Sequence, residues 1–276
     1  MKSQHLFLLA AVSIAAMGAP SAQPFNCPPD SVRSGNICVD TYEASVWEIP
    51  PASTTLIKKV KLGIANLADL QAGGAVQRGV DSSVGFGPGC PDTGAGCKNL
   101  YAVSIPGVFP SGAAINWFQA AAVCRNSAKR LLTNAEWQVA ALGTPDPGTD
   151  NGTTDCNIGD GTLNNSVALT GSRSACISDV GAHDMVGNDS EFVADWGSIT
   201  VQGGTWASWS PAFGGDLSLV GGGGQSLSTL GFLPAATLRG GFWGQGSFAG
   251  VYFIDQNGVP ASQGGGFNAV SPRCGR

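Results

Sequence analysis

Side chains able to do redox, nucleophilic or metal chemistry are few in this chain. Beyond residue 22 the sequence holds a single histidine, His183, together with eight cysteines. Iron sites of the two-histidine, one-carboxylate type and zinc sites with three protein ligands need more nitrogen or unpaired sulfur than this. A Ser-His-Asp triad built on His183 remains formally possible.

The first 22 residues have the pattern of a signal peptide. Lys2 precedes an apolar run from Leu6 to Ala16, and small residues follow as far as Ala22. The run is too short to span a membrane. We therefore expect cleavage near Ser21 or Ala22 and a secreted or periplasmic protein, with no membrane span.

The eight cysteines are even in number, which in an exported chain indicates four disulfides. Spacing alone leaves their connectivity open, although the short intervals favour the pairs Cys27–Cys38 and Cys90–Cys97. The remaining cysteines are Cys124, Cys156, Cys176 and Cys274.

The elements that must position these side chains are predicted best in residues 113–141, which indicate two short helices. Asn116 stands three residues before Gln119, and Thr133 stands three before Glu136. Each pair is typical of a capping box, in which the two side chains satisfy the first free backbone N–H groups of a helix. Between the helices lies a basic connection that starts at Lys129-Arg130, for which an anion site is one reading.

Composition bounds the class of protein. Loss of Lys2 with the signal peptide leaves 13 of the 14 basic residues against 19 acidic ones, a net charge of −6. This balance, without a basic cluster, argues against nucleic acid or an anionic membrane as partner. The 41 glycines and the charged fraction of 12% indicate a loop-rich fold. We expect one domain over 23–276, with a Gly/Ser-rich insertion at about 197–237.

Five stretches occur in an informative order. CVDTYEAS covers 38–45, and INWFQAAAVCRNSAKRLLTNAEWQVAA covers 115–141; GAHDMVGNDSEFVADW, LRGGFW and PRCGR follow at 181–196, 238–243 and 272–276. Together they resemble the formylglycine-generating enzyme family, also called sulfatase-modifying factors, and CVDTYEAS is similar to the opening strand of that family. The resemblance implies an α+β fold that is a loop-rich, disulfide-stapled variant of the C-type lectin fold.

The resemblance also bears on the cysteines and on catalysis. It implies that Cys124 pairs with Cys274, which leaves Cys156 for Cys176. The two cysteines with which the family binds copper(I) align with Gln245 and Gly250, and neither residue offers the soft thiolate that copper(I) prefers. We therefore expect no copper and none of the defining activity.

Other positions take structural readings from the same resemblance. His183 stands where the family has an aromatic residue, so we expect it to pack. Arg130 is expected to form a buried pair with Glu136, Glu191 or Asp195. The four tryptophans of these motifs are expected in the core: Trp117, Trp137, Trp196 and Trp243.

Calcium is the metal that the resemblance implies, because the family holds structural calcium in two loops. The matching oxygen donors, of the hard kind that calcium prefers, belong to Asn157, Ile158, Asp160, Asn188 and Glu191. The alternative is that Asn157 and Asn188 only hydrogen-bond their own turns.

Residues 241–270 differ in kind from the rest of the chain. They mix Gly, Ser, Asn and Gln with aromatic residues and are nearly uncharged, which is typical of binding surfaces and resembles the hypervariable ends of ligand-binding proteins diversified by retroelements. A neutral closing strand and loop is the alternative. The predicted ligand-binding face consists of Phe242, Gln245, Phe248, Tyr252 and Phe253.

The sequence thus predicts an exported sulfatase-modifying-factor-like domain protein that is not an enzyme. It would act as a ligand-binding or structural module for an unknown protein or small molecule. The alternative is an oxidoreductase of the formylglycine-generating or siderophore-maturation type that works without the usual cysteine pair.

Overall fold

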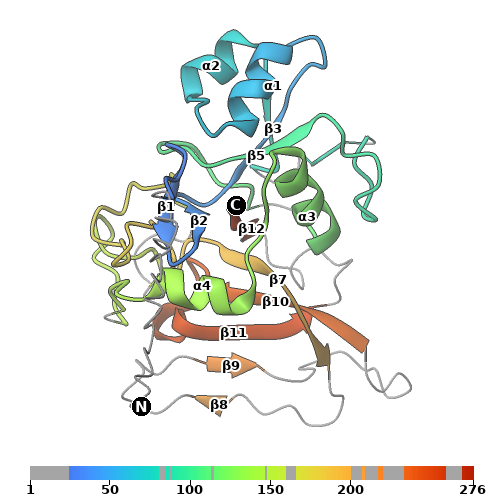
Figure 1. The fold of residues 1–276 in the computed structure, drawn as a ribbon. Coiled ribbons are helices and arrows are strands. Elements are labelled where there is room, and N and C mark those ends of the chain that lie inside the picture. The colour runs from blue at the N-terminus through green and yellow to red at the C-terminus, as the bar shows by residue number, and fades with distance from the viewer. Residues whose placement is uncertain are drawn as a thin grey trace, which may run out of the picture.

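A computed structural model describes residues 25–80, 85–87, 89–112, 115–146, 148–159, 166–199, 207–208, 217–219, 233–258 and 269–276 (Figure 1). The predicted signal peptide, Asp160 and most of the predicted insertion at 197–237 lie outside these residues. Within them, no helix is both long and apolar enough to cross a membrane.

Early and late segments of the chain meet in a four-stranded antiparallel sheet. Its strand order is β1 (Ser31–Ser34), β2 (Ile37–Asp40), β13 (Cys274–Gly275) and β6 (Arg130–Leu131). β1 and β2 form a hairpin whose two-residue turn starts at Gly35, where the backbone φ of 60° suits glycine. A late segment, β13, therefore fills an inner position between two earlier strands.

The largest sheet has six strands and lies below the helices in Figure 1. β12 is parallel to β7, and β9 is parallel to β11, whereas the other pairs are antiparallel. A register shift in β10 between Ala236 and Leu238 bends the middle of the sheet. The strand order is β12 (Val270–Pro272), β7 (Ser190–Ile199), β10 (Leu233–Gly240), β11 (Gly250–Gly258), β9 (Leu217–Leu219) and β8 (Ala207–Ser208).

A three-stranded sheet carries the two small helices at the top of Figure 1. These five elements enclose a separate apolar cluster that includes Trp47, Leu56 and Leu70. The strands and helices are β4 (Val76–Arg78), β3 (Ser45–Glu48), β5 (Leu100–Val103), α1 (Thr54–Lys61) and α2 (Leu67–Ala72).

The two predicted helices are α3 (Trp117–Asn126) and α4 (Asn134–Ala141). Both begin with the expected capping boxes: the Asn116 side chain accepts from the backbone N–H of Gln119, and the Thr133 side chain accepts from that of Glu136. Each N3 side chain reaches back to the N-cap backbone. The capping prediction is therefore confirmed.

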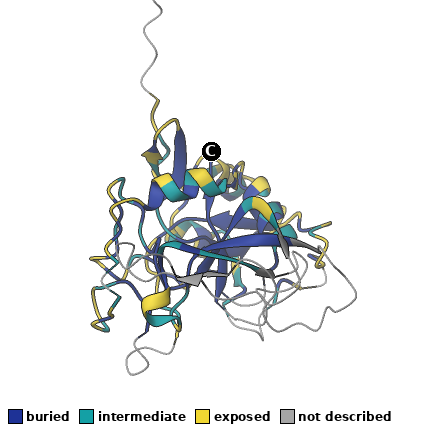
Figure 2. Ribbon diagram, turned by 90° about the horizontal axis from the view of Figure 1, so that it is seen from below, coloured by how far each residue is buried: buried dark blue, intermediate teal, exposed yellow. Residues whose placement is uncertain are grey.

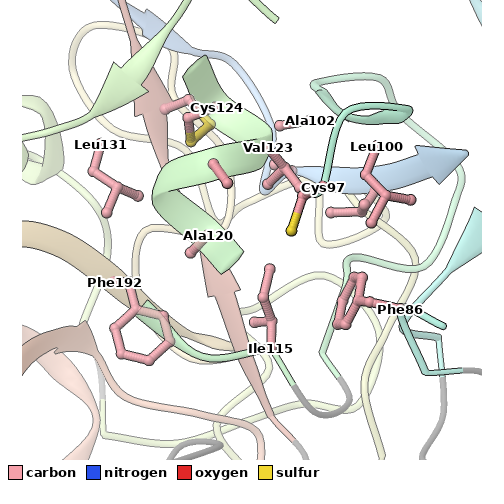
Figure 3. Packing of buried hydrophobic residues seen from close by; sticks show 14 of the residues in the cluster. Phe86, Cys97, Leu100, Ala102, Ile115, Ala120, Val123, Cys124, Leu131 and Phe192 are labelled. Atoms are coloured by element: carbon pink, nitrogen blue, oxygen red, sulfur yellow. A yellow bond between two sulfur atoms is a disulfide. The ribbon is translucent and has the colours of Figure 1, made fainter. Parts of the chain in front are cut away.

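The main core forms between α3 and the sheets. Figure 3 shows Ala120, Val123 and Cys124 on α3, with Leu131 and Phe192 on the side of Ala120 and with Cys97 and Ala102 on the side of Val123. Figure 2 shows how the buried strands run through the interior, whereas the helices keep one exposed side. Small residues on α3 allow close approach, and the core is correspondingly thin.

Four disulfides use all eight cysteines, in the pairs set out from spacing and resemblance. Cys124–Cys274 joins α3 to β13 across 150 residues of sequence. In the chain-entropy model a closure of this length contributes roughly 4–5 kcal/mol. The other pairs are Cys27–Cys38, Cys90–Cys97 and Cys156–Cys176.

Two predictions, one about burial and one about a strand, were wrong. Trp196 is 40% exposed instead of buried, because its position near the outer end of β7 directs it toward Trp117 and Phe118 at the start of α3, with ring centroids 5.0 and 5.8 Å away. The opening motif at 38–45 is not one strand, since β2 ends at Asp40 and β3 begins at Ser45.

Candidate functional site

Three loops that are far apart in sequence are joined by backbone hydrogen bonds. The first is residues 157–159, the second is 187–188, and the third is 240–246. Asn188 N–H donates to the Asn157 carbonyl at 2.7 Å, and Gly246 N–H donates to the Ile158 carbonyl at 2.7 Å. Together we call them the site loops. The family motifs that carry the candidate metal and catalytic positions therefore converge in one place.

Gly187 makes this convergence sterically possible. Its backbone φ is 74°, and a Cβ atom there would lie 2.4 Å from the Asn157 carbonyl oxygen. Any other residue would both strain the backbone and separate the first two loops.

The two positions that align with the family's copper-binding cysteines both lie near Gly241. A Cβ on Gly241 would be 2.6 Å from Gln245 Oε1 and 2.7 Å from Ala249 Cβ, which precedes Gly250. Gln245 Oε1 accepts a hydrogen bond from Phe242 N–H at 3.0 Å. Gly250 is buried and begins β11, opposite Gly240 of β10. The side chains at the two aligned positions are an amide and a hydrogen atom.

No thiol elsewhere can take their place, because all eight cysteines are bonded in disulfides. Copper(I) in a protein prefers soft sulfur ligands. The residues present therefore do not fit a copper(I) site of the family's kind.

Asn157 and Asn188 form the centre of a buried amide network. Asn157 Nδ2 donates to Asn188 Oδ1 at 2.9 Å and to the Ser166 carbonyl at 3.1 Å. Asn188 Oδ1 also accepts from Ala168 N–H at 2.8 Å, and its Nδ2 donates to the buried carboxylate of Glu43. These amides connect the first two site loops to the opening motif of the chain.

A buried arginine hydrogen-bonds the first site loop. Arg173 Nη2 donates to Asn157 Oδ1 at 3.1 Å, and Nη1 donates to Asp150 Oδ1 at 3.0 Å. The side chains of Arg173 and Asp150 are 4% and 0% exposed. A cationic group thus already occupies the space between these oxygens.

Glu191 lies in a different environment from the asparagines. Its Oε1 accepts from Arg273, and its Oε2 accepts from the indole N–H of Trp137 at 2.5 Å. Arg273 is fully buried and also donates to the carbonyl oxygens of Asp40 and His183. Glu191 is therefore part of an ion pair at the centre of the fold.

The described oxygens of the predicted calcium loops do not fit calcium in this arrangement. Asn157 Oδ1, Asn188 Oδ1, the Ile158 carbonyl and the Glu191 carboxylate all accept N–H bonds from the protein. Nor do the described ranges contain a group of three or more His, Cys, Asp or Glu side chains able to hold a metal ion. The calcium prediction rests on the sequence resemblance alone.

Several acids are buried around Arg273. Burial, followed by the charge of Asp189, raises the pKa of Glu43 well above its usual value. Burial also raises the pKa of Asp184 to about 6 and that of Asp189 well above its usual range. Both Asp189 carboxylate oxygens are buried and have no hydrogen-bond partner within the described part of the chain. For Asp184, desolvation outweighs the nearby guanidinium groups of Arg273 and Arg173.

His183 packs against Tyr42, with ring centroids 4.8 Å apart. Burial, and then the charge of Arg273, lower its pKa. Its buried Nδ1 has no hydrogen-bond partner among the described residues, so no carboxylate orients the ring. This arrangement fits the structural reading of His183 and lacks the contacts of a triad.

The predicted ligand-binding face is only partly at the surface. Phe248 is 49% exposed, and Phe242, Gln245 and Tyr252 are half-buried. Phe253 is 1% exposed and belongs to the interior, which corrects its assignment to the face. Its position in β11 next to half-buried Tyr252 follows from the alternation of a strand, which the aromatic composition of the tail concealed.

In the basic connection between the helices, Lys129 is buried, whereas Arg130, the residue expected to be buried, is exposed. Lys129 is the buried residue, with Nζ 2.5 Å from Asp40 Oδ1 and 2.7 Å from Asp30 Oδ2. Arg130 pairs with Glu136 as anticipated, but its side chain is 49% exposed, so the expectation of a buried pair was wrong. Lys129 directly precedes β6, and its side chain is buried against Asp40 and Asp30, whereas Arg130, the first residue of β6, is exposed.

Sequence reasoning missed Glu43, Asp150 and Arg173. Glu43 lies within the opening motif, which offered a signal. Asp150 and Arg173 lie in irregular loops, where neither periodicity nor a motif marks a long-range contact.

Comparison with known proteins agrees with this geometry. Residues 110–256 match the profile of the sulfatase-modifying factor enzyme 1-like domain, FGE-sulfatase. The match covers more than half of the 276 residues, and the chain belongs to this family. The mixed α+β fold with four disulfides agrees with the predicted fold class.

Solved structures that are similar include variants of a major tropism determinant. The I1 variant is 16% identical with a TM-score of 0.48, and the P3c variant is 17% identical with a TM-score of 0.46. In both cases the match covers 90% of this chain and 52% of the other, so this chain spans about half their length. A search of curated proteins found no match.

Proposed function

We propose that this chain is an exported, non-catalytic member of the sulfatase-modifying factor family that binds a ligand through its third site loop and the start of β11. The observation that carries the proposal is the state of the two catalytic positions. Gln245 and Gly250 lie where the family places its thiols, and every cysteine of the chain is in a disulfide. Four disulfides also favour an oxidising compartment.

Support for binding comes from the surface beside these positions. Phe242, Gln245, Phe248 and Tyr252 combine rigid aromatic area with a polar amide, and we call them the loop face. Phe242 and Trp243 pack edge to face with centroids 5.7 Å apart, which limits the entropy lost on binding. The composition of the loop face favours an uncharged ligand, such as a glycan or a neutral peptide.

The catalytic half of the proposal is tested with a cysteine-containing peptide of the sulfatase type. The purified protein is incubated with copper and this peptide under air, and the peptide is then analysed by mass spectrometry. We expect the cysteine to remain unchanged. Conversion of its thiol to the aldehyde would contradict the proposal and favour an oxidoreductase that works without the usual cysteine pair.

The binding half is tested with a glycan array and a library of neutral peptides as probes. We expect Phe248→Ala to lower the affinity for any captured probe about tenfold or more, since aromatic anchors dominate such interfaces. Phe109→Ala is the matched control, because Phe109 is 45% exposed but lies on another part of the molecule. Equal losses in both variants, or no bound probe, would contradict a ligand-binding loop face.

A further inference from the structure

Arg173 hydrogen-bonds both the first site loop and the neighbouring acid Asp150. Its guanidinium connects Asp150 Oδ1 with Asn157 Oδ1 through two separate N–H groups, at 3.0 and 3.1 Å. The rest of the Asp150 carboxylate is satisfied by backbone, since Oδ1 accepts from Gly152 N–H at 2.7 Å and Oδ2 from Gly159 N–H at 3.3 Å. The acid Asp150, the amide Asn157 and the cation Arg173 thus form one buried hydrogen-bonded cluster.

The backbone that carries Arg173 is fixed at several points. Its carbonyl accepts from Cys176 N–H at 2.9 Å, and Ala175 N–H donates to the Thr154 carbonyl at 2.9 Å. Cys176 is itself bonded to Cys156, which directly precedes Asn157. The guanidinium is therefore held against the loop by a covalent crosslink and by the local hydrogen bonds.

Burial makes the charge of Arg173 necessary to this loop. Asp150 is 0% exposed in its side chain, and an isolated carboxylate without a partner is costly in such a place. A guanidinium has only donors and keeps its charge at all relevant pH values. It supplies the positive charge and also satisfies the oxygen of Asn157, two tasks that a bound cation would perform.

We propose that Arg173 replaces a metal ion in this loop, so that the chain carries as a side chain the cation that its family binds as calcium. A calcium ion near Asn157 Oδ1 would lie beside a guanidinium that donates to the same oxygen, and the two positive charges would repel each other. The first site loop is thereby independent of calcium.

The test compares thermal unfolding of the wild-type protein and an Arg173→Gln variant, each with a calcium chelator or with millimolar calcium. For the wild type we expect the two midpoints to agree within about 1 °C, since a ligand that does not bind cannot stabilise. For Arg173→Gln with chelator we expect the midpoint to fall by roughly 6–12 °C, because Asp150 loses its buried partner.

Calcium should restore at least half of that loss in Arg173→Gln, since the vacated space is lined by a carboxylate and an amide oxygen. Arg78→Gln is the matched control, because Arg78 forms a partly exposed pair with Glu48, and its midpoint should not respond to calcium. A second variant, Arg173→Gln with Asp150→Asn, removes both charges and should fold without a calcium response.

Two results would overturn the proposal. One is a wild-type midpoint raised by calcium by more than about 3 °C, which would mean that the loop binds the ion with Arg173 in place. The other is a loss in Arg173→Gln that calcium does not reverse, which would reduce Arg173 to an ordinary ion pair. If Arg173→Gln cannot be recovered folded, direct calorimetric titration of the wild type with calcium decides, and stoichiometric binding would refute the proposal.

Discussion

Two buried charge networks hold this fold, and they balance their charges differently. The terminal network, where β1, β2 and β13 meet, has two acids and two cations in direct contact: Asp30, Asp40, Lys129 and Arg276. The inner network lies behind the site loops. Among the described residues its members are four interacting acids and one guanidinium that acts on three of them: Glu43, Asp184, Asp189, Glu191 and Arg273.

The difference shows how each network tolerates burial. In the terminal network Lys129 and Arg276 help to lower the pKa of Asp30 although burial opposes them, so that acid stays ionised. In the inner network the acids outnumber the cation, and burial raises the pKa of Glu43, Asp184 and Asp189. Ion pairs keep Asp30 of the first network ionised, although burial still raises the pKa of Asp40 there to about 6. In the second network, protons compensate for missing cations.

The largest expected effect comes from removing the central cation of the terminal network. Lys129→Met should lower the free energy of unfolding by about 3–5 kcal/mol, because it leaves Asp40 buried without a charge partner. Urea denaturation measures the loss. Lys59→Met is the control, since Lys59 and Asp69 form a partly exposed surface pair, and it should cost less than about 1 kcal/mol. Similar losses in both variants would remove the distinction between buried and surface pairs.

The pH dependence of stability sharpens the comparison between the networks. Burial raises the pKa of Asp40 and of Asp184 from 3.8 to about 6. Between these values the folded protein binds more protons than the unfolded chain. The contribution of these two groups to the free energy of unfolding is therefore complete below about pH 4 and falls as the pH rises toward 6. Above pH 6 these groups cause no further change.

Each of these groups should account for on the order of 1–3 kcal/mol of that fall. Chemical denaturation at pH 4, 5, 6 and 7 of the wild type, Asp40→Asn and Asp184→Asn would resolve the two contributions, because each variant should flatten the curve in part. If Asp40→Asn left the slope unchanged, Lys129 would be keeping Asp40 ionised, and the terminal network would be fully charged.

The smallest effect is expected for the surface pair that lies outside both networks. The hydrogen bond from Arg130 is the main cause that lowers the pKa of Glu136 to about 2, yet the Arg130 side chain is 49% exposed. Arg130→Gln should therefore cost no more than about 1 kcal/mol, measured by thermal unfolding at low and high salt. A loss comparable to that of Lys129→Met would show that exposure does not separate the two neighbours.

What could be predicted from sequence follows the range over which each interaction acts. The capping boxes of α3 and α4 depend on residues three apart, and they were identified correctly. Cys124–Cys274 was predicted across 150 residues, because the family resemblance supplied a contact that spacing alone left open.

Contacts between irregular loops were not predictable in this way. No sequence pattern near Arg173 predicts its contacts with Asp150 and Asn157. Nor does the basic connection indicate that Lys129, and not Arg130, is buried. The aromatic tail misled for a related reason. Composition suggests a surface, but the alternation of β11 decides that Phe253 faces inward.

The inner position of β13 has a consequence for biosynthesis. A ribosome releases β2 and β6 long before Cys274 and Gly275, so the four-stranded sheet lacks its inner strand until almost the whole described chain has been made. During that interval Cys124 is a thiol without its partner, while Cys27, Cys38, Cys90 and Cys97 are already present. The native disulfide therefore forms only if Cys124 stays unpaired until Cys274 has been made. A disulfide isomerase that reverses premature bonds to Cys124 should raise the yield of the native protein.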